Sequence, residues 1–404
     1  MTLFATVELA PRDPILGLNE QFNADLNPAK VNLGVGVYFN DQGKLPLLAC
    51  VKAAERLLTD AAKPRGYLPI DGIAAYAKAV QGLVFGADSA VLQAGRVATV
   101  QSLGGTGGLK VGADFLKRLN PVAKVLISDP SWENHRALFT HAGFPVETYA
   151  YYDAAARDVR FEAMLADLCA APVSTIVVLH ACCHNPTGYD IKPSQWIRVI
   201  DTCKARGLVP FLDMAYQGFG DGIAEDGAAV QQFVASGLEF FVATSFSKSF
   251  SLYGERVGAL SVVCSTQDES ARVLSQLKIA IRTNYSNPPT HGAQVVATVL
   301  DTPALRQQWE DELAGMRQRI NQMRTLLADK LKAAGVEQDC SFITRQRGMF
   351  SYSGLDAAQM QRLRGEFGVY GLDSGRICVA ALNTGNIDGV VAAITNVLRL
   401  KKQN

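Results

Sequence analysis

One stretch sets what fold and chemistry to expect of this chain: Ser245-Phe246-Ser247-Lys248-Ser249-Phe250-Ser251-Leu252-Tyr253-Gly254-Glu255-Arg256-Val257-Gly258. It follows an apolar run, residues 240–244, that is predicted to be a strand. A lysine amine can form a Schiff base with an aldehyde if it can lose its proton. Serine hydroxyls and the bidentate guanidinium of Arg256 can hold a phosphate. A small molecule that carries both groups is pyridoxal 5′-phosphate (PLP). The alternative is a solvated polar turn after a strand.

Length and composition place the chain among ordinary globular proteins. Its 404 residues are enough for two or three domains, and 48% are hydrophobic against 19% charged. The net charge of +1 gives no sign of a nucleic-acid or membrane partner. Residues 1–8 lack the basic and apolar regions of a signal peptide, and no apolar run reaches about 18 residues. We therefore expect a cytoplasmic protein.

The eight cysteines are scattered along the chain. Without a secretory signal they are expected to be free thiols in a reducing cytosol. Cys182, Cys183 and His184 are adjacent, but neighbouring cysteines without a second pair of ligands are a weak metal signal. We therefore predict no metal site.

Short β-branched runs alternate with helical stretches between residues 95 and 265. This alternation predicts an α/β fold in which helices cover both faces of a mainly parallel, seven-stranded sheet. We expect a large domain of residues 42–314 and a smaller α+β domain, residues 1–41 plus 315–404, that closes over the substrate. The expected strands of the sheet are Arg96–Gln101, Val125–Ser128, Val146–Tyr149, Thr175–His180, Val209–Asp213, Phe240–Ser245 and Gly258–Cys264.

Other segments predict the elements around this sheet. Val31–Tyr38 contains two glycines and is predicted to be a strand or extended segment whose backbone comes close to another group. Residues 266–335 are predicted to be mainly helical, with one long amphipathic helix from Ala304 to Ala334. The remaining expected elements are helices at Ile15–Asn23, 46–85 (broken at Pro64–Pro69), 356–367 and 387–400, and strands at Met349–Tyr352 and Arg376–Ala380.

A glycine-rich turn, Leu103–Lys110, follows one predicted strand and opens a helix. Such a turn presents backbone N–H groups and a helix N-terminus to an anion. Its spacing fits neither a dinucleotide fingerprint nor a Walker A loop. Beside Lys248 and Arg256, the turn is a candidate for the PLP phosphate through Gly105 and Thr106. Taken alone, it could be an ordinary tight turn.

Two further polar residues follow the ends of predicted strands. Asn185 is well placed to donate to a ligand in the crevice at a strand's carboxyl end, although an Asn-Pro turn is common. Asp213 ends an apolar run, and a buried carboxylate there needs a cation, which a protonated pyridine nitrogen would supply. Its alternative role is a helix cap. Tyr216 lies three residues on, so both side chains could face one ligand.

Over its whole length the chain resembles the class I, fold type I PLP-dependent aminotransferases. Within them it is most similar to the bacterial aromatic (tyrosine) amino acid aminotransferases. The motifs of the opening stretch carry this resemblance together with six others. These are Tyr67-Leu68-Pro69-Ile70-Asp71-Gly72, Ser128-Asp129-Pro130-Ser131-Trp132-Glu133-Asn134-His135, His184-Asn185-Pro186-Thr187-Gly188, Asp213-Met214-Ala215-Tyr216-Gln217-Gly218-Phe219, Arg282-Thr283-Asn284-Tyr285-Ser286-Asn287-Pro288-Pro289 and Ser374-Gly375-Arg376-Ile377-Cys378-Val379-Ala380.

The resemblance implies a role for each candidate residue. Lys248 would carry PLP and later move the substrate proton, Asp213 would pair with the pyridine nitrogen, and Tyr216 would assist catalysis. The implied cofactor-binding residues are Gly105, Thr106, Trp132, Asn185, Asp213, Tyr216, Ser245, Ser247, Lys248, Arg256 and, from a partner subunit, Tyr67. The implied substrate-binding residues are Gly36, Trp132, Asn185, Arg376 for the α-carboxylate and, from the partner, Arg282 for a side-chain carboxylate. The family also has cis peptide bonds before Pro130 and Pro186.

The expected function is transamination in a homodimer, between an aromatic or dicarboxylic L-amino acid and 2-oxoglutarate. Phe39 and Leu45 favour the aromatic substrates, since the matching positions of aspartate-specialised relatives are usually a Lys and a Thr. Val37 and Asn287 instead match those relatives, so the alternative is an aspartate aminotransferase with little aromatic activity. PLP-dependent decarboxylases and lyases share this fold, but the paired arginines favour transamination. A non-enzymatic PLP-binding regulator would need a DNA-binding segment, for which no residues are expected to be spare.

Overall fold

The computed structural model describes residues 2–399 and falls into two compact units. Unit 1 takes in the residues up to Lys44, Gln322–Thr344 and the residues from Met349 onward, and unit 2 takes in Leu45–Asn321 and Arg345–Gly348. These units differ from the predicted domain ranges at 42–44, 315–321 and 345–348, and the domain boundaries stay a prediction. Residues 400–404 of the predicted small domain lie outside the described residues.

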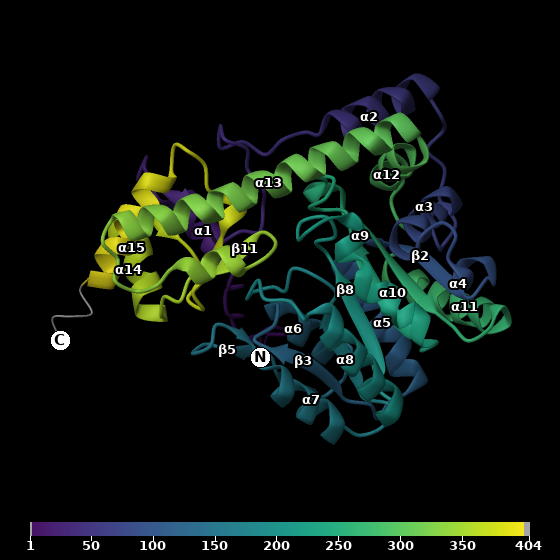
Figure 1. Cartoon of the computed structure of the whole chain (residues 1–404). Coiled ribbons are helices and arrows are strands. Elements are labelled where there is room, and N and C mark those ends of the chain that lie inside the picture. The colour runs from purple at the N-terminus through teal and green to yellow at the C-terminus, as the bar shows by residue number, and fades with distance from the viewer. Residues whose placement is uncertain (1, 400–404) are drawn as a thin grey trace. The chain divides into compact units, whose positions relative to one another are not determined.

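Unit 2 is built on one seven-stranded sheet (Figure 1). The strand order is β2-β10-β9-β8-β7-β3-β4, and β10 runs antiparallel to both of its neighbours while the other neighbouring strands are parallel. The predicted fold class is therefore confirmed. The strands are β2 (Val97–Leu103), β3 (Val125–Asp129), β4 (Val146–Ala150), β7 (Ile176–His180), β8 (Val209–Met214), β9 (Phe240–Ser245) and β10 (Val257–Val263).

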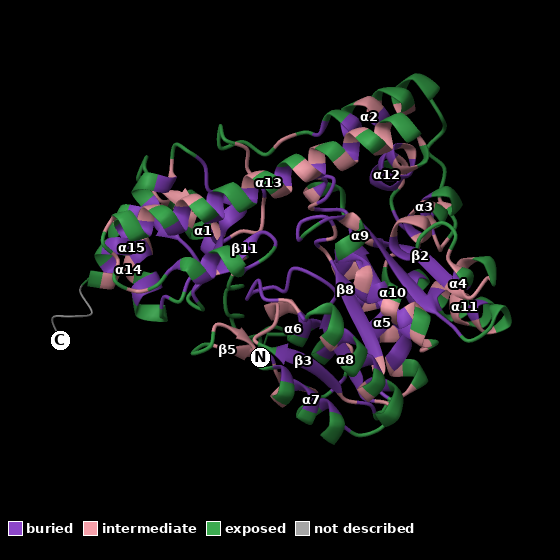
Figure 2. Cartoon of the chain, viewed as in Figure 1, coloured by how far each residue is buried: buried purple, intermediate pink, exposed green. Residues whose placement is uncertain are grey.

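Several helices of unit 2 pack on this sheet. Helix α5 contacts β2, β9 and β10, whereas α6 contacts β3 and β4. The inner strands are almost entirely buried (Figure 2) and have continuous apolar sequences, whereas the edge strand β4 has exposed residues. The helices of this unit are α2 (Ala49–Ala61), α3 (Ala74–Phe85), α4 (Ala90–Gln93), α5 (Gly104–Leu119), α6 (Glu133–His141), α7 (Phe161–Ala170), α8 (Pro193–Arg206), α9 (Ile223–Asp226), α10 (Ala228–Ser236), α11 (Gln267–Asn284) and α12 (His291–Asp301). A small hairpin joins β5 (Tyr152–Asp153) and β6 (Asp158–Val159).

Local signals explain where several helices begin and end. Helix α11 begins after Thr266, whose hydroxyl accepts a hydrogen bond from the backbone N–H of Glu269 at 3.1 Å. Helix α8 begins with Pro193 and ends at Gly207, which has a left-handed conformation. The long helix α13 (Pro303–Ala333) matches the amphipathic helix predicted from Ala304 to Ala334. Within residues 2–399, every helix is too short or too polar to cross a membrane.

Unit 1 contains two small sheets and the remaining helices. β1 pairs in parallel with β12, and β11 pairs antiparallel with β13. Its elements are α1 (Leu16–Ala24), β1 (Val31–Asn32), β11 (Phe350–Tyr352), α14 (Ala357–Phe367), β12 (Val369–Tyr370), β13 (Arg376–Cys378) and α15 (Ile387–Arg399). Residue 400 of the predicted last helix lies outside the described residues.

One predicted strand of unit 1 needs correction. The strand predicted at Arg376–Ala380 ends at Cys378, because the chain then turns into a 3₁₀ helix in which the N–H of Leu382 donates to Val379 O at 3.0 Å. In Val31–Tyr38 only the first two residues pair as a strand. The close backbone approach expected there is present, since a Cβ on Gly36 would lie 2.7 Å from Cζ of Phe350.

Candidate active site

Lys248 lies in the connection between β9 and β10, where the chain reverses direction. The N–H of Phe246 donates to Val257 O at 3.0 Å and closes this connection. Phe250, on the other side of the lysine, is fully buried and stacks on Trp309 with ring centres 4.7 Å apart. This hydrogen bond and the ring stack fix the backbone on both sides of Lys248, while its ammonium lies 5.2 Å from the centre of the Tyr216 ring.

The groups predicted to hold phosphate lie together beside this connection. Arg256 donates from Nη1 to Ser247 Oγ at 3.3 Å, and Gly104 N–H donates to Arg256 O at 2.9 Å. Helix α5 begins at Gly104, so its first N–H groups carry the partial positive charge of a helix N-terminus. Gly105 lies against Ser245, because a Cβ on the glycine would be 3.1 Å from Cβ of the serine.

Two glycines of this cradle are required by space. Gly104 has φ of +69°, and a Cβ on it would lie 2.5 Å from Nη2 of Arg256. A Cβ on Gly258 would lie 2.3 Å from the carbonyl carbon of Gly104. The close packing lets a guanidinium, serine hydroxyls and a helix N-terminus gather at one point, with Thr106 in the first turn of the helix. This donor set fits the phosphate of PLP.

Asp213 lies at the end of β8 and is held by a histidine that the sequence reading did not assign. His135 on α6 is fully buried, and its Nε2 is 2.9 Å from Asp213 Oδ2. Burial would raise the pKa of Asp213, but the hydrogen bond from His135 and the charge of Lys248 lower it, and the net pKa lies below its ordinary value. The carboxylate can only accept, so His135 donates from Nε2 and Nδ1 faces Ser131 Oγ at 2.9 Å. An ionised, buried Asp213 fits a protonated pyridine nitrogen.

Two more buried histidines lie next to this pair. His180 ends β7, pairs in register with Asp213, and has its ring centre 5.0 Å from that of His135. Burial and, to a smaller extent, the nearby His135 lower the pKa of His180 to about 3. His184 is stacked on Tyr151 at 3.9 Å, and burial lowers its pKa well below the usual range. Both rings are therefore neutral around pH 7 and add no competing charge beside Asp213.

Asn185 follows β7 in a turn that is tied down at its backbone. The carboxylate of Asp190 accepts from the N–H groups of Cys183 and His184, each at 2.8 Å. Asn185 is buried, and its bond to Pro186 is cis, as is the Asp129–Pro130 bond. The two cis bonds implied by the family resemblance are thus confirmed. Burial raises the pKa of Asp190 to about 6.

Trp132, predicted to stack on the cofactor ring, comes directly before α6. Its ring lies edge-on to His135 with centres 5.3 Å apart, and it packs against the core of unit 2. It therefore shares a neighbour with Asp213, which brings the two predicted ring contacts to one region of unit 2. The ordinary alternative, a core tryptophan, is compatible with the same packing.

The predicted substrate residues of unit 1 are both placed around Phe350. Arg376 on β13 is 1% exposed, its Nη2 donates to Gly34 O at 2.7 Å, and its guanidinium lies 4.2 Å from the centre of the Phe350 ring. Gly36 meets the edge of the same ring. Unit 1 thus brings Gly36 and Arg376 together on one aromatic side chain.

Tyr67 and Arg282 are the two residues assigned to a partner subunit. Tyr67 is 98% exposed. Arg282, in the last turn of α11, is also exposed and donates to Ser286 Oγ of its own chain. Neither side chain joins the cluster around Lys248 in the interactions described above. Exposure leaves both available to a second chain, and their roles stay predictions.

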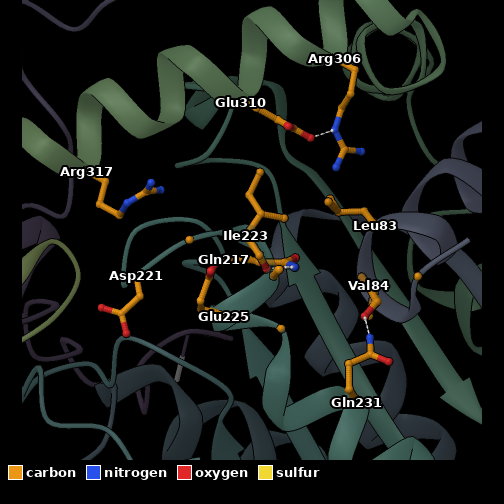
Figure 3. Close-up of a pocket in the computed structure, with 14 residues that line it drawn as sticks. Leu83, Val84, Gln217, Asp221, Ile223, Glu225, Gln231, Arg306, Glu310 and Arg317 are labelled. Carbon is orange, nitrogen blue, oxygen red and sulfur yellow. Dashed lines mark hydrogen bonds and ion pairs between the residues drawn. The ribbon is translucent and has the colours of Figure 1, made fainter.

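A separate pocket of about 650 Å³ lies in unit 2 between α13 and the segment that follows Tyr216 (Figure 3). Arg306, Glu310 and Arg317 line it from the helix, and the residues that line it include none of the predicted site residues. Arg317 donates to Gly218 O at 2.7 Å and so ties the segment to α13. We assign no ligand to this pocket, since Arg306 is already paired with Glu310 at 2.5 Å.

Comparison with known proteins agrees with this geometry. The family model described as aminotransferase class I and II matches residues 28–394. An aspartate aminotransferase of Pseudomonas aeruginosa is 64% identical over 98% of this chain and all of its own, and an aromatic-amino-acid aminotransferase of Escherichia coli is 52% identical over the same shares. An aromatic-amino-acid aminotransferase of Burkholderia pseudomallei, covalently bound to pyridoxal phosphate, superposes with a TM-score of 0.96 at 64% identity, covering 98% of this chain and 100% of that one.

The chain belongs to the class I and II aminotransferase family, and it is an aminotransferase. The predicted family and enzyme class are therefore confirmed, and the predicted cofactor agrees with the PLP held by the Burkholderia relative. His135 and His180 are the members of the site that the sequence reading missed. His135 ends the motif Ser128–His135 quoted above, but that motif gave it no role, and the signal of His180 is only a His at the end of an apolar run.

Proposed function

We propose that this chain holds PLP on Lys248 and transfers amino groups between aromatic or dicarboxylic L-amino acids and 2-oxoglutarate. The amino acids are tyrosine, phenylalanine, aspartate and glutamate. The observation that carries the proposal is the placement of Lys248 and Tyr216 beside an anion cradle, with the buried carboxylate of Asp213 kept ionised. Relatives with names from both substrate classes align over the full length of the chain.

Each residue has a distinct task in this proposal. PLP, when bound, supplies an aldehyde carbon for the substrate amino group and a cationic ring that withdraws electrons from Cα. The carboxylate of Asp213 keeps a proton on the ring nitrogen by charge pairing. The amine of Lys248 would take the proton from Cα and return it to the carbon that PLP supplies as the aldehyde; proton transfer by a positioned side chain typically accelerates reactions by about 10²–10⁴-fold. Arg376 orients the α-carboxylate through its two parallel N–H donors.

The proposal includes a cytoplasmic homodimer in which two chains complete each site. Its support is the exposure of Tyr67 and Arg282, which the family resemblance assigns to the partner's site. No nucleic-acid partner is proposed, since the net charge is +1. Amino and oxo acids are the substrates that the aminotransferase class requires.

Substrate range is the part of the proposal that depends on Phe39 and Leu45. Apolar side chains favour an aromatic substrate by about 25 cal/mol for each Å² buried. Arg282 still offers a dicarboxylate a charge-assisted pair worth about 1.5–3 kcal/mol. For an aromatic substrate an unpaired buried charge would be costly, so the proposal has Arg282 turn towards solvent. An Arg with this freedom gives one pocket two modes of binding.

Half-reactions followed by cofactor absorbance test the proposal. Phenylalanine, tyrosine, aspartate and glutamate should each convert the yellow holoenzyme to its amino form, and 2-oxoglutarate should restore it. In Phe39→Lys/Leu45→Thr, kcat/KM for the aromatic donors should fall much more than kcat/KM for aspartate. Negligible aromatic turnover in the unmodified enzyme would favour the alternative, an aspartate aminotransferase with little aromatic activity. Loss of carbon dioxide or of a side chain from the amino acid would indicate a decarboxylase or lyase.

A further inference from the structure

A second buried arginine, Arg324, lies on the part of α13 that belongs to unit 1. It is 1% exposed and is among the largest fully buried side chains described for the protein. A guanidinium keeps its charge under all ordinary conditions, so its burial is costly unless hydrogen bonds replace water. In the sequence, Arg324 is only one residue of the predicted amphipathic helix Ala304–Ala334.

The guanidinium of Arg324 donates hydrogen bonds to the strand that carries Phe350. Nη2 donates to Phe350 O at 2.5 Å, and Nη1 donates to Ser351 Oγ at 2.5 Å. Nη1 also donates to Ile343 O at 3.3 Å in the preceding 3₁₀ helix. Ser351 is fully buried and Phe350 is 3% exposed, so water does not compete for these contacts. Arg324 therefore holds both the backbone of Phe350 and the side chain of Ser351 at the start of β11.

On its other side, Phe350 supports the proposed α-carboxylate arginine. The guanidinium of Arg376 lies 4.2 Å from the ring centre, and β11 pairs with β13 so that Tyr352 lies opposite Arg376. Only a glycine fits at position 36, because a Cβ there would lie 2.7 Å from Cζ of Phe350. The ring of Phe350 is therefore held in place, and it gives the guanidinium of Arg376 a fixed surface to lie against.

We infer that Arg324 is a positioning residue for α-carboxylate recognition: it fixes Phe350, and Phe350 orients the guanidinium of Arg376. The inference rests on the proposed function, in which Arg376 binds the α-carboxylate. Bidentate recognition of a carboxylate depends on the angle of the guanidinium plane, and a misplacement of about 1 Å at a positioning contact costs on the order of 100-fold in rate or binding. Both amino donors and oxo acids carry this carboxylate, so a misplaced Arg376 should weaken the binding of both.

A double-mutant cycle on the holoenzyme tests this inference, with Arg324→Lys, Arg376→Lys and the double variant. KM and kcat are measured for glutamate and for 2-oxoglutarate, together with the urea midpoint. Arg324→Lys keeps the charge but loses the planar fork, and it should raise KM for both substrates by about 10- to 100-fold while kcat changes far less. In the Arg376→Lys background the same change should have almost no further effect on KM, since the oriented group is already lost. Arg324→Met should act in the same direction and more strongly.

The matched control is Lys330→Met, which removes a cation of the same helix from its surface pair with Asp388. It should leave KM for both substrates unchanged. Additive effects of Arg324→Lys and Arg376→Lys, or an unchanged KM in a stable Arg324→Lys variant, would overturn the inference. A fall in urea midpoint without the change in KM would also do so, because it indicates a structural role alone. If Arg376→Lys itself leaves KM unchanged, the proposed role of Arg376 is wrong, and the two failures are thereby distinguished.

Discussion

At the scale of single residues, the chemistry of the site depends on buried charge. Asp213 keeps an ionised carboxylate inside unit 2 because His135 donates to it and Lys248 lies near, although burial alone would raise its pKa. The free-energy cost of burying the Asp213 carboxylate is offset by hydrogen bonding and charge pairing with these two side chains rather than by solvent. One prediction below concerns Asp213 itself, and a second concerns the neighbouring buried histidine, His180.

We expect Asp213→Asn to weaken catalysis far more than cofactor binding. An amide cannot hold a proton on the ring nitrogen by charge pairing, so kcat should fall on the order of 10²–10³-fold, the usual loss for a preorganised electrostatic partner. PLP should still bind, because the phosphate contacts around Arg256 are untouched. Steady-state kinetics and equilibrium dialysis measure the two effects. Asp221→Asn, at an exposed carboxylate paired with Arg347, is the control. Near-normal kcat in Asp213→Asn would show that Asp213 has another role.

We expect His180 to make the folded protein sensitive to acid. Its pKa is about 3 when folded, against 6.5 ordinarily, so folding keeps the ring neutral. Between these values the unfolded chain binds a proton that the folded chain does not, and stability falls as the pH decreases from 6.5 towards 3. Each pKa unit corresponds to about 1.4 kcal/mol.

The variant His180→Phe removes this titration and keeps an apolar ring. The difference between its urea midpoints at pH 7 and pH 5 should be smaller than in the unmodified protein. His141→Gln, at an exposed histidine, serves as the control. An identical pH dependence in His180→Phe and the unmodified protein would contradict the assignment of the buried ring as the source.

At the scale of elements, one carboxylate organises the segment between β8 and α10 that carries Tyr216. Asp226, at the end of α9, accepts from the N–H groups of Gly218, Gly220 and Asp221 at 2.8 to 3.0 Å. The buried rings of Tyr216 and Phe219 anchor one part of this segment, but its glycines have no side chain to pack. Its shape therefore depends on these three hydrogen bonds and on the bond from Arg317 to Gly218 O.

We expect Asp226→Ala to lower the free energy of unfolding by about 1–3 kcal/mol or more, because it leaves two buried donors and one partly buried donor without an acceptor. Asp226→Asn keeps one acceptor oxygen and should lie between Asp226→Ala and the unmodified protein. Urea titration monitored by circular dichroism gives the comparison. Asp201→Ala, on the exposed face of α8, is the matched control and should change the midpoint little. Equal midpoints for Asp226→Ala and Asp201→Ala would rule out the organising role.

At the scale of the whole molecule, the proposed homodimer has a direct test in mixed dimers. A Lys248→Ala chain and an Arg282→Ala chain each lack one residue. If Arg282 acts in the partner's site, half of the sites in a mixed dimer combine an intact Lys248 with an intact Arg282. Dicarboxylate activity should then recover to at most half of the unmodified value per dimer.

The control for mixed dimers is each variant alone. Lys248→Ala should be inactive, and Arg282→Ala should have low activity with aspartate. Purified mixed dimers without any recovered aspartate activity would indicate that each site is built from a single chain. Recovery would support the assignment of Arg282 to the partner.

The sequence alone determined the features that are local. Seven runs rich in β-branched residues coincide with the seven strands of the sheet to within one or two residues, because the inner strands are buried on both faces and need continuous apolar sequence. The turn at Gly104 and Gly105, the lysine after β9 and the acid at the end of β8 were predictable for the same reason. Each depends on residues next to one another in the chain.

Only the tertiary structure decided the contacts between distant residues. His135 reaches Asp213 across 78 positions, and Arg324 holds the strand on which Phe350 supports Arg376. It also limited Val31–Tyr38 to a two-residue strand, since β12 offers only Val369 and Tyr370 as partners. A buried polar group is stable only where it has a hydrogen-bond partner. When that partner is distant in the sequence, the residues around the group do not predict which residue it is.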